Sequence, residues 1–163
     1  MSKQFWGFLV VGLVAVGLAV AAIWSGTKGA HLDLTGKIIN VRSVPIDGKT
    51  MLVVVDFRVT NPSDIPLVIR EVSLKMERYK DTPLNGTEVS RGDVDTMFEA
   101  FPAIGAKVKD VLAPPETVGP GKTIDRMAEA TFETTKAAVE VRKAVILHVE
   151  DVDGAEFDIT EKK

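Results

Sequence analysis

Apolar and polar side chains alternate in short runs along most of the chain after residue 30. The clearest run covers residues 51–60, where Val53, Val55, Phe57 and Val59 alternate with Val54, Asp56, Arg58 and Thr60. A period of two residues is typical of a β-strand that turns one face to a core and the other to solvent. We therefore predict a long, half-buried central strand over residues 51–60.

Several other segments show the same pattern. They predict strands over residues 32–35, 38–44, 67–77, 123–133, 145–149 and 157–159, with a short edge strand at 88–89. The dipeptides Asp47-Gly48 and Asp153-Gly154 favour hairpin turns, and Asn85-Gly86 predicts a further turn. The apolar register slips between Ile69 and Val72, which predicts a bulge near Arg70-Glu71. Six to eight short strands with little helix favour an all-β fold, an antiparallel immunoglobulin/fibronectin-III-like β-sandwich over residues 30–163.

Residues 91–112 interrupt the strand pattern and predict a short helical insertion. Ser90 followed by Asp93 has the spacing of a capping box, so we expect a helix over residues 93–100 that Pro102 ends. The insertion carries a cluster of apolar residues: Phe98, Phe101, Pro102 and Ile104. One interpretation is that this cluster covers an open end of the sandwich. The other is that it forms an exposed patch for a protein or lipid partner.

The N-terminal segment has a different character. Phe5–Trp24 contains 20 residues without a charge, and at 1.5 Å per residue a helix of this length spans about 30 Å, the thickness of a bilayer core. We predict a single transmembrane helix contacting membrane lipid, within an anchor and linker over residues 1–29. Lys3 favours a cytoplasmic N-terminus and a periplasmic or extracellular sandwich. The alternative is a signal peptide cleaved near Ala21, which would give a secreted protein.

The composition limits the partners and the kinds of site that fit this chain. The 163 residues are 45% hydrophobic and 26% charged, which suits a packed core. The net charge of −3 argues against nucleic acid as a partner. The chain has no cysteine, which excludes disulfides and thiolate metal sites. The oligomeric state stays open.

No motif for catalysis or for a cofactor emerges. The histidines are His31 and His148, and we interpret His148 as a solvated residue on a strand rather than as a metal ligand. A Gly-x-Ser-x-Gly nucleophile turn is absent, and the acidic stretch around Asp151 does not align with a calcium-binding loop. We therefore predict no catalytic residue, no metal ligand and no cofactor.

One stretch carries a family resemblance, through the pattern Phe57-x-Val59-x-Asn61-Pro62-x-x-x-Pro66-Leu67-x-Ile69. It resembles the signature of the WHy domain (water stress and hypersensitive response), found in type-2 late embryogenesis abundant proteins. The resemblance covers roughly residues 32–132. It implies a fibronectin-like sandwich and a part in desiccation or stress protection, with signature residues Phe57, Asn61, Pro62, Pro66 and Leu67 in structural roles. The insertion at residues 91–112 departs from the family pattern by its length.

These observations lead us to expect a non-enzymatic, membrane-anchored module for stress protection or protein interaction at the cell envelope. A first alternative is a binding protein for lipid or another apolar ligand. Held in the sandwich interior, such a ligand needs a sizeable cavity lined by core residues such as Val55, Phe57 and Phe132. A second alternative, ranked lower, is a hydrolase, which needs convergent polar groups in a pocket.

Overall fold

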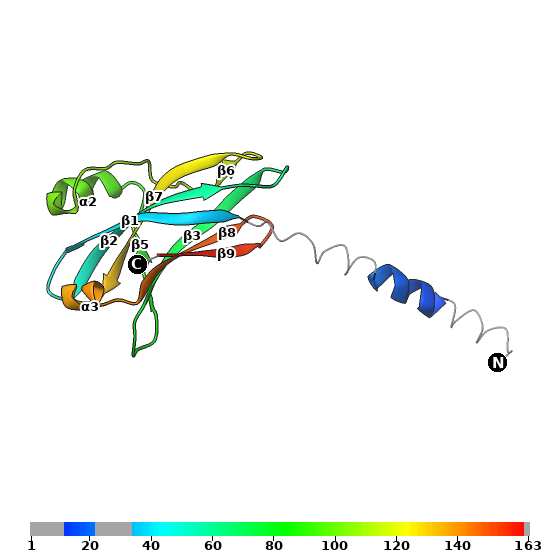
Figure 1. Ribbon diagram of the computed structural model, residues 1–163, viewed down its shortest axis with the longest axis horizontal. Coiled ribbons are helices and arrows are strands. Elements are labelled where there is room, and N and C mark those ends of the chain that lie inside the picture. The colour runs from blue at the N-terminus through cyan, green and yellow to red at the C-terminus, as the bar shows by residue number, and fades with distance from the viewer. Residues whose placement is uncertain (1–11, 22–33, 162–163) are drawn as a thin grey trace. The chain divides into compact units, whose positions relative to one another are not determined.

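The computed structural model describes residues 12–21 and 34–161 (Figure 1). Contacts divide the chain into two compact units, Met1–Leu32 and Asp33–Lys163. Residues 12–21 are helical, and the rest of the predicted anchor and its linker, residues 1–11 and 22–29, lies outside the described residues. Among the residues that the structure describes, no helix combines the length and the apolar character needed to cross a bilayer.

The second unit is an all-β structure of two sheets, which confirms the predicted fold class at this level. Sheet A has the strand order β1 (Thr35–Pro45), β2 (Thr50–Thr60), β7 (Thr123–Glu133), β5 (Thr87–Glu88). Sheet B has the order β4 (Leu84–Asn85), β3 (Leu67–Glu77), β8 (Ala144–Asp151), β9 (Glu156–Thr160), and β6 (Glu116–Val118) also pairs with β3. Neighbouring strands pair antiparallel. The helical segments are α2 (Val94–Ala100), η1 (Pro102–Ile104) and α3 (Lys136–Glu140).

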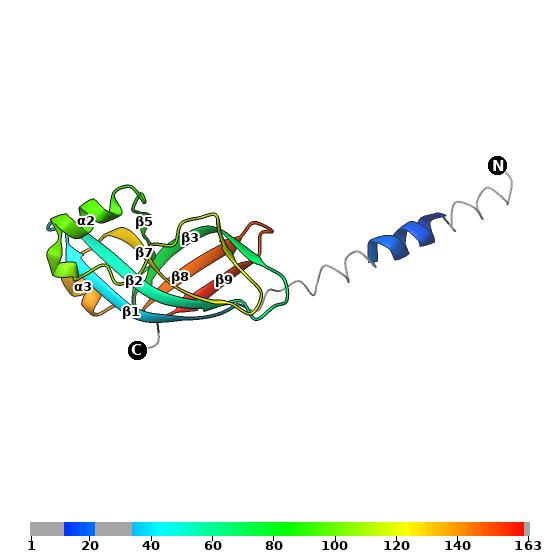
Figure 2. The same ribbon diagram turned by 90° about the horizontal axis from the view of Figure 1, so that it is seen from above.

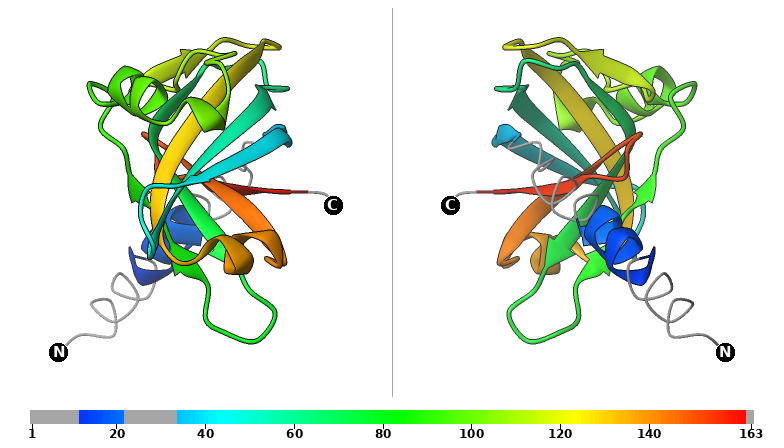
Figure 3. Two further views of the ribbon diagram at one scale, coloured as in Figure 1. Left: turned by 90° about the vertical axis from the view of Figure 1, so that its left-hand side faces the viewer. Right: turned by 90° about the vertical axis from the view of Figure 1, so that its right-hand side faces the viewer.

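The main core lies between the two sheets, which Figure 3 shows end-on. Val55 and Phe57 of β2 and Phe132 of β7 are fully buried there, as are Leu74 and Leu147 of sheet B. Alternation along each strand delivers one side chain in two to this layer. The predicted inward set of β2 is therefore correct.

The other face of β2 differs from the prediction. Leu52 and Val54 are also fully buried, and Asp56 is only 6% exposed. The expectation of a half-buried strand is wrong here because the insertion packs on this outer face of sheet A. A period-two pattern reveals one buried face, but it does not show what a distant segment does to the other.

Two local predictions, a bulge in β3 and a turn at Asn85-Gly86, had different outcomes. The ladder between β3 and β8 shifts between Ile69 and Glu71, which confirms the predicted bulge. The turn predicted at Asn85-Gly86 is wrong, because the chain passes there from β4 in sheet B to β5 in sheet A. A Cβ added at Gly86 would lie 2.6 Å from Ala130 Cβ and 2.8 Å from Phe132 Cζ. Glycine is required at this crossing because the chain passes so close to the core.

The two α-helices of the sheet unit begin in different ways. Thr135 caps α3, its Oγ1 accepting a hydrogen bond from the Ala138 N–H at 3.4 Å. The predicted capping box at Ser90 is wrong. Asp93 is the residue before α2 and makes no side-chain cap, while its N–H donates to the Ser90 carbonyl in a preceding turn.

Candidate functional site

The insertion forms a strap over the outer face of sheet A. Figures 1 and 2 both place α2 beside the ends of β1 and β2 that their hairpin joins. Val94 and Ile104 are buried against Val54 and Leu52, in a second apolar cluster separate from the main core. The strap covers a sheet face, so the expectation that it closes an open end of the sandwich is wrong.

The four residues singled out in this segment occupy different environments. Ile104 is 2% exposed and belongs to the buried cluster. Phe98 and Phe101 are half-buried and pack against the same cluster, whereas Pro102 is exposed. The apolar surface of these side chains is therefore turned mainly towards the sheet.

A charged row lies beneath this strap. The β-sheet register aligns Arg42 of β1, Val54 of β2 and Glu129 of β7, so their side chains share the outer face. Asp56 lies two residues after Val54 in β2, so its side chain is on the same face. Arg42, Asp56 and Glu129 thus form a group of three ionisable residues inside an apolar cluster.

Arg42 fastens the strap to the sheet. Its Nη2 donates to Asp56 Oδ1 at 3.0 Å, and its Nη1 donates to the carbonyl oxygens of Ile104 at 3.1 Å and Ala106 at 2.9 Å. The guanidinium also lies 5.7 Å from the centre of the Phe98 ring, within the range of a cation–π contact. One side chain therefore joins β1, β2, the end of η1 and the segment that follows it.

Glu129 has no such partner. The residue is 4% exposed, and neither carboxyl oxygen makes a hydrogen bond within the described residues. Burial raises the pKa of this carboxyl from 4.5 to about 7, against the opposing attraction of Lys107 and Arg42. A charge without a hydrogen-bonding partner is costly to bury, so the protonated form is favoured below about pH 7.

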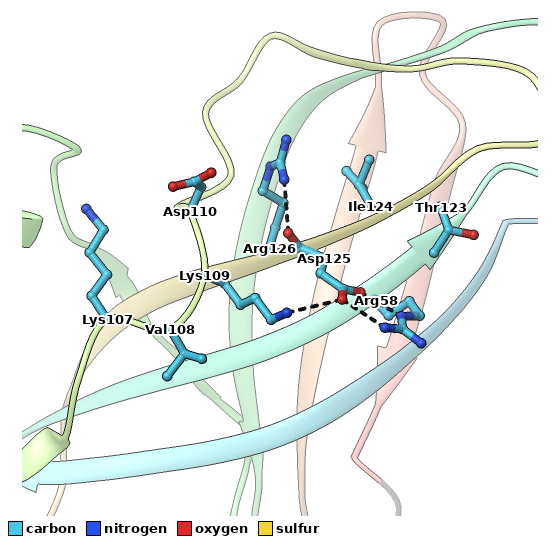
Figure 4. A pocket seen from close by; sticks show the side chains of 9 residues that line it. All are labelled: Arg58, Lys107, Val108, Lys109, Asp110, Thr123, Ile124, Asp125 and Arg126. Carbon is cyan, nitrogen blue, oxygen red and sulfur yellow. Dashed lines mark hydrogen bonds and ion pairs between the residues drawn. The ribbon is translucent and has the colours of Figure 1, made fainter.

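A polar hollow of about 590 Å³ opens beside the strap (Figure 4). Its charged lining comes from β2, from the start of β7 and from the segment after η1: Arg58, Lys107, Lys109, Asp110, Asp125 and Arg126. Two bonds from Arg58, at 2.6 and 2.8 Å, and one from Lys109, at 3.2 Å, converge on Asp125. Hydrogen bonding from Arg58 is the largest cause that holds the pKa of Asp125 well below its ordinary value. Arg58, Lys109 and Asp125 therefore neutralise one another in this hollow.

The signature loop is a second concentration of polar contacts. Asn61 is fully buried, and its Nδ2 donates to the carbonyl oxygens of Ile65 at 2.8 Å and Val118 at 3.0 Å. Its Oδ1 accepts from the N–H of Ser63 at 3.1 Å and from the Ser63 hydroxyl at 2.6 Å. Leu67 and Phe57 are buried on either side of the loop, while Pro62 and Pro66 are exposed. The loop is thus held by Asn61 to the neighbouring 118–122 segment.

Ser73, His148 and Asp158 also form a row, across β3, β8 and β9. His148 Nδ1 lies 2.7 Å from Asp158 Oδ1, whereas its Nε2 faces Glu156 Oε2 at 3.9 Å. The ring is thus placed between two carboxylates and does not point its second nitrogen at Ser73. Within the described residues no group of three or more potential ligands is placed to hold a metal ion.

The sequence did not reveal the charged row or the hollow. Arg42 and Glu129 are 87 positions apart, and each reads as an ordinary polar residue on the outer face of a strand. The sequence offers one signal: a charged residue stands within each of two apolar stretches. Arg42 lies two positions before Val44, and Glu129 lies between Ala128 and Ala130. That signal does not distinguish a solvated face from a covered one.

Comparison with known proteins adds little. No family model matches the chain, and no curated protein matches it. A solved structure described as "X-ray structure of Northeast Structural Genomics Consortium target SoR45" has 12% sequence identity over 80% of each chain, with a TM-score of 0.33. A likeness this weak carries no argument about fold or function.

Proposed function

We propose that the chain is a non-enzymatic module that acts at the cell envelope, in stress protection or protein interaction. Its sheet unit is an immunoglobulin/fibronectin-III-like sandwich of the WHy type. Phe5–Trp24 forms a transmembrane helix, with the N-terminus in the cytoplasm and the sandwich outside it. Secretion after cleavage near Ala21 is the alternative.

The observation that carries this proposal is the use of Asn61. This signature residue uses both amide hydrogens and its carbonyl oxygen in bonds that hold the loop, and none of this capacity faces solvent. A residue with this environment serves the fold rather than chemistry on a substrate. This favours the structural role that the WHy resemblance implies for the signature.

The charged hollow supports the same proposal. Arg58 and Lys109 are bound to Asp125, and Arg126 donates to Glu116 at 2.8 Å. Catalytic groups need to be poised towards a substrate, whereas these groups neutralise one another. They suit a stable surface better than a reactive one.

An apolar ligand is a second candidate, and one observation limits where it would bind. Val55, Phe57 and Phe132 are fully buried, and they line none of the surface hollows described above. The half-buried rings of Phe98 and Phe101 make the strap the better place for a protein or lipid partner.

Fractionation of native cells, with mass spectrometry of the N-terminus, tests the anchoring. We expect the intact N-terminus in the membrane fraction. An N-terminus at Ala22 in a soluble fraction would defeat this part of the proposal. A deletion strain subjected to desiccation and osmotic shock tests the role, and unchanged survival would count against stress protection.

A further inference from the structure

The strap over sheet A combines three features that do not fit a permanently closed element. It covers a small apolar cluster separate from the main core, so opening it leaves the space between the sheets intact. It is fastened by polar contacts to Arg42. Beneath it lies Glu129, a buried carboxyl with neither oxygen bonded.

The two cations that attract this carboxyl already have partners. Lys107 Nζ donates to Asp95 Oδ1 at 2.6 Å, but both residues belong to the strap. Arg42 links the strap to the sheet, because it bonds both Asp56 and the carbonyl oxygens of Ile104 and Ala106. An ionised Glu129 would therefore compete for Arg42 with the contacts that hold the strap. The Nε of Arg42, which is buried without a hydrogen-bonding partner, makes that side chain a ready donor.

We propose that residues 91–107 form a pH-responsive flap, which Arg42 holds closed while Glu129 is protonated and releases when Glu129 ionises, while Asp110 and Leu112 stay bonded to Met127 of β7. Opening uncovers the apolar outer face of sheet A around Leu52 and Val54, together with the rings of Phe98 and Phe101. The apolar surface of the strap thereby becomes available in one protonation state and is hidden in the other.

The charged groups around Glu129 set the direction of the switch. They come from the elements packed on it: Arg42 on β1, Asp56 on β2, Asp95 on α2 and Lys107 after η1. Asp56 and Asp95 occupy the two cations in the closed form, and Asp95 also disfavours a second negative charge nearby. A proton on Glu129 is thus the simplest way to keep the closed arrangement neutral.

The pH window follows from the two states of one carboxyl. In the closed form its pKa is about 7, and in water its ordinary value is 4.5. The population of the open form relative to the closed form therefore rises between about pH 4.5 and about pH 7, and it stays constant at higher pH. Since each unit of pKa difference is a factor of ten, we expect opening to increase at least about tenfold across this range.

Hydrogen exchange of the full chain at pH 5 and pH 8, expressed as protection relative to the intrinsic exchange rate, tests the proposal. In the unaltered protein we expect protection over residues 94–104 to fall at least about tenfold at pH 8, while β8 keeps its protection. Glu129→Gln should abolish the fall, with the strap protected at both pH values. Glu88→Gln, at an exposed acid on β5, is the matched control and should behave like the unaltered protein.

Two results would overturn the proposal: no pH-dependent loss over residues 94–104 in the unaltered chain, or the same loss in Glu129→Gln. If Glu129→Gln fails to fold, as lost protection of β8 would show, Arg42→Lys takes its place, because lysine keeps the charge but lacks the forked guanidinium that bonds the strap carbonyls. Arg42→Lys should lower the protection of the strap severalfold at pH 5 and spare β8. A strap as well protected as in the unaltered protein would refute the proposal.

Discussion

At the level of single residues, Asn61 shows how a signature position can be fully explained by the fold. Its two N–H groups and its carbonyl oxygen all have partners, and two of the bonds reach the Ile65 and Val118 carbonyls. A buried group that loses its partner costs more than the bond itself contributes. The residue is therefore expected to matter for stability wherever the protein acts.

Asn61→Ala should lower the free energy of unfolding by about 2–3 kcal/mol, because the buried Val118 carbonyl and the Ser63 N–H lose their partner. Urea denaturation of both proteins measures the difference. Asn40→Ala, at an exposed position of β1, is the control and should change stability by less than about 0.5 kcal/mol. Equal effects of the two substitutions would show that the Asn61 bonds contribute nothing.

Gly86 gives a second residue-scale prediction. A methyl group there would meet Ala130 and Phe132 within 3 Å, so Gly86→Ala should cost about 1–3 kcal/mol of stability through overpacking. Gly48→Ala is the matched control, since nothing lies within 4 Å of the added carbon. Thermal unfolding distinguishes them, and a Gly86→Ala protein as stable as the Gly48→Ala protein would contradict the close approach.

The sequence predicted part of this residue-scale picture. The family resemblance implied a structural role for Asn61, and the bond to Ile65 is local in sequence. The bond to Val118 spans 57 positions and depends on how the strands are ordered. Gly86 was interpreted as a turn residue because Asn-Gly favours turns, whereas its real constraint comes from β7, far away in sequence.

At the level of elements, the long strands β2, β3 and β7 were predictable, whereas β6 and the surroundings of the strands were not, and the two strands expected over residues 32–44 form one strand, β1. The alternation in β2 gave the strand and its inward side chains, and the slip after Ile69 gave the bulge in β3. The helix of the insertion was also expected, but an apolar helical face indicates only that something covers it. Whether that partner is an open end, a sheet face or another molecule depends on tertiary packing.

Ionic links between elements give a prediction about acid stability. Asp125 joins β7 to β2 through Arg58 and to the segment after η1 through Lys109. Hydrogen bonding from Arg58 lowers the pKa of Asp125 below its ordinary value of 3.8. Its contribution to stability is therefore present above pH 3.8 and is lost as the pH falls further.

Asp125→Asn should accordingly reduce the loss of stability between pH 5 and pH 2, because the titrating partner of Arg58 is gone. Denaturation midpoints at each pH provide the measurement. Asp64→Asn, at an exposed loop position, should retain the acid sensitivity of the unaltered protein. If Asp125→Asn and Asp64→Asn lose stability equally on acidification, the Arg58–Asp125 link does not control it.

At the level of the whole molecule, the chain divides into two units, and we expect one to determine stability and the other to determine membrane attachment. The buried apolar residues of both clusters lie between Val44 and Ile159, within the unit Asp33–Lys163. The apolar segment that we propose as the anchor lies in the other unit. Stability and membrane attachment are therefore expected to respond to different changes.

Removal of residues 1–32 tests this separation directly. The truncated chain should unfold with the same free energy as the full chain, to within about 0.5 kcal/mol, because all core residues in the part of the chain that the structure describes are kept. It should also move from the membrane fraction to the soluble fraction.

A double substitution, Leu13→Arg with Leu18→Arg, keeps the full length but places two charges in the apolar segment, at a cost of about 2.5–3.5 kcal/mol each near a bilayer centre. If Phe5–Trp24 is the anchor, this variant should be released like the truncated one. Retention of either variant in the membrane fraction would mean that attachment comes from the sheet unit.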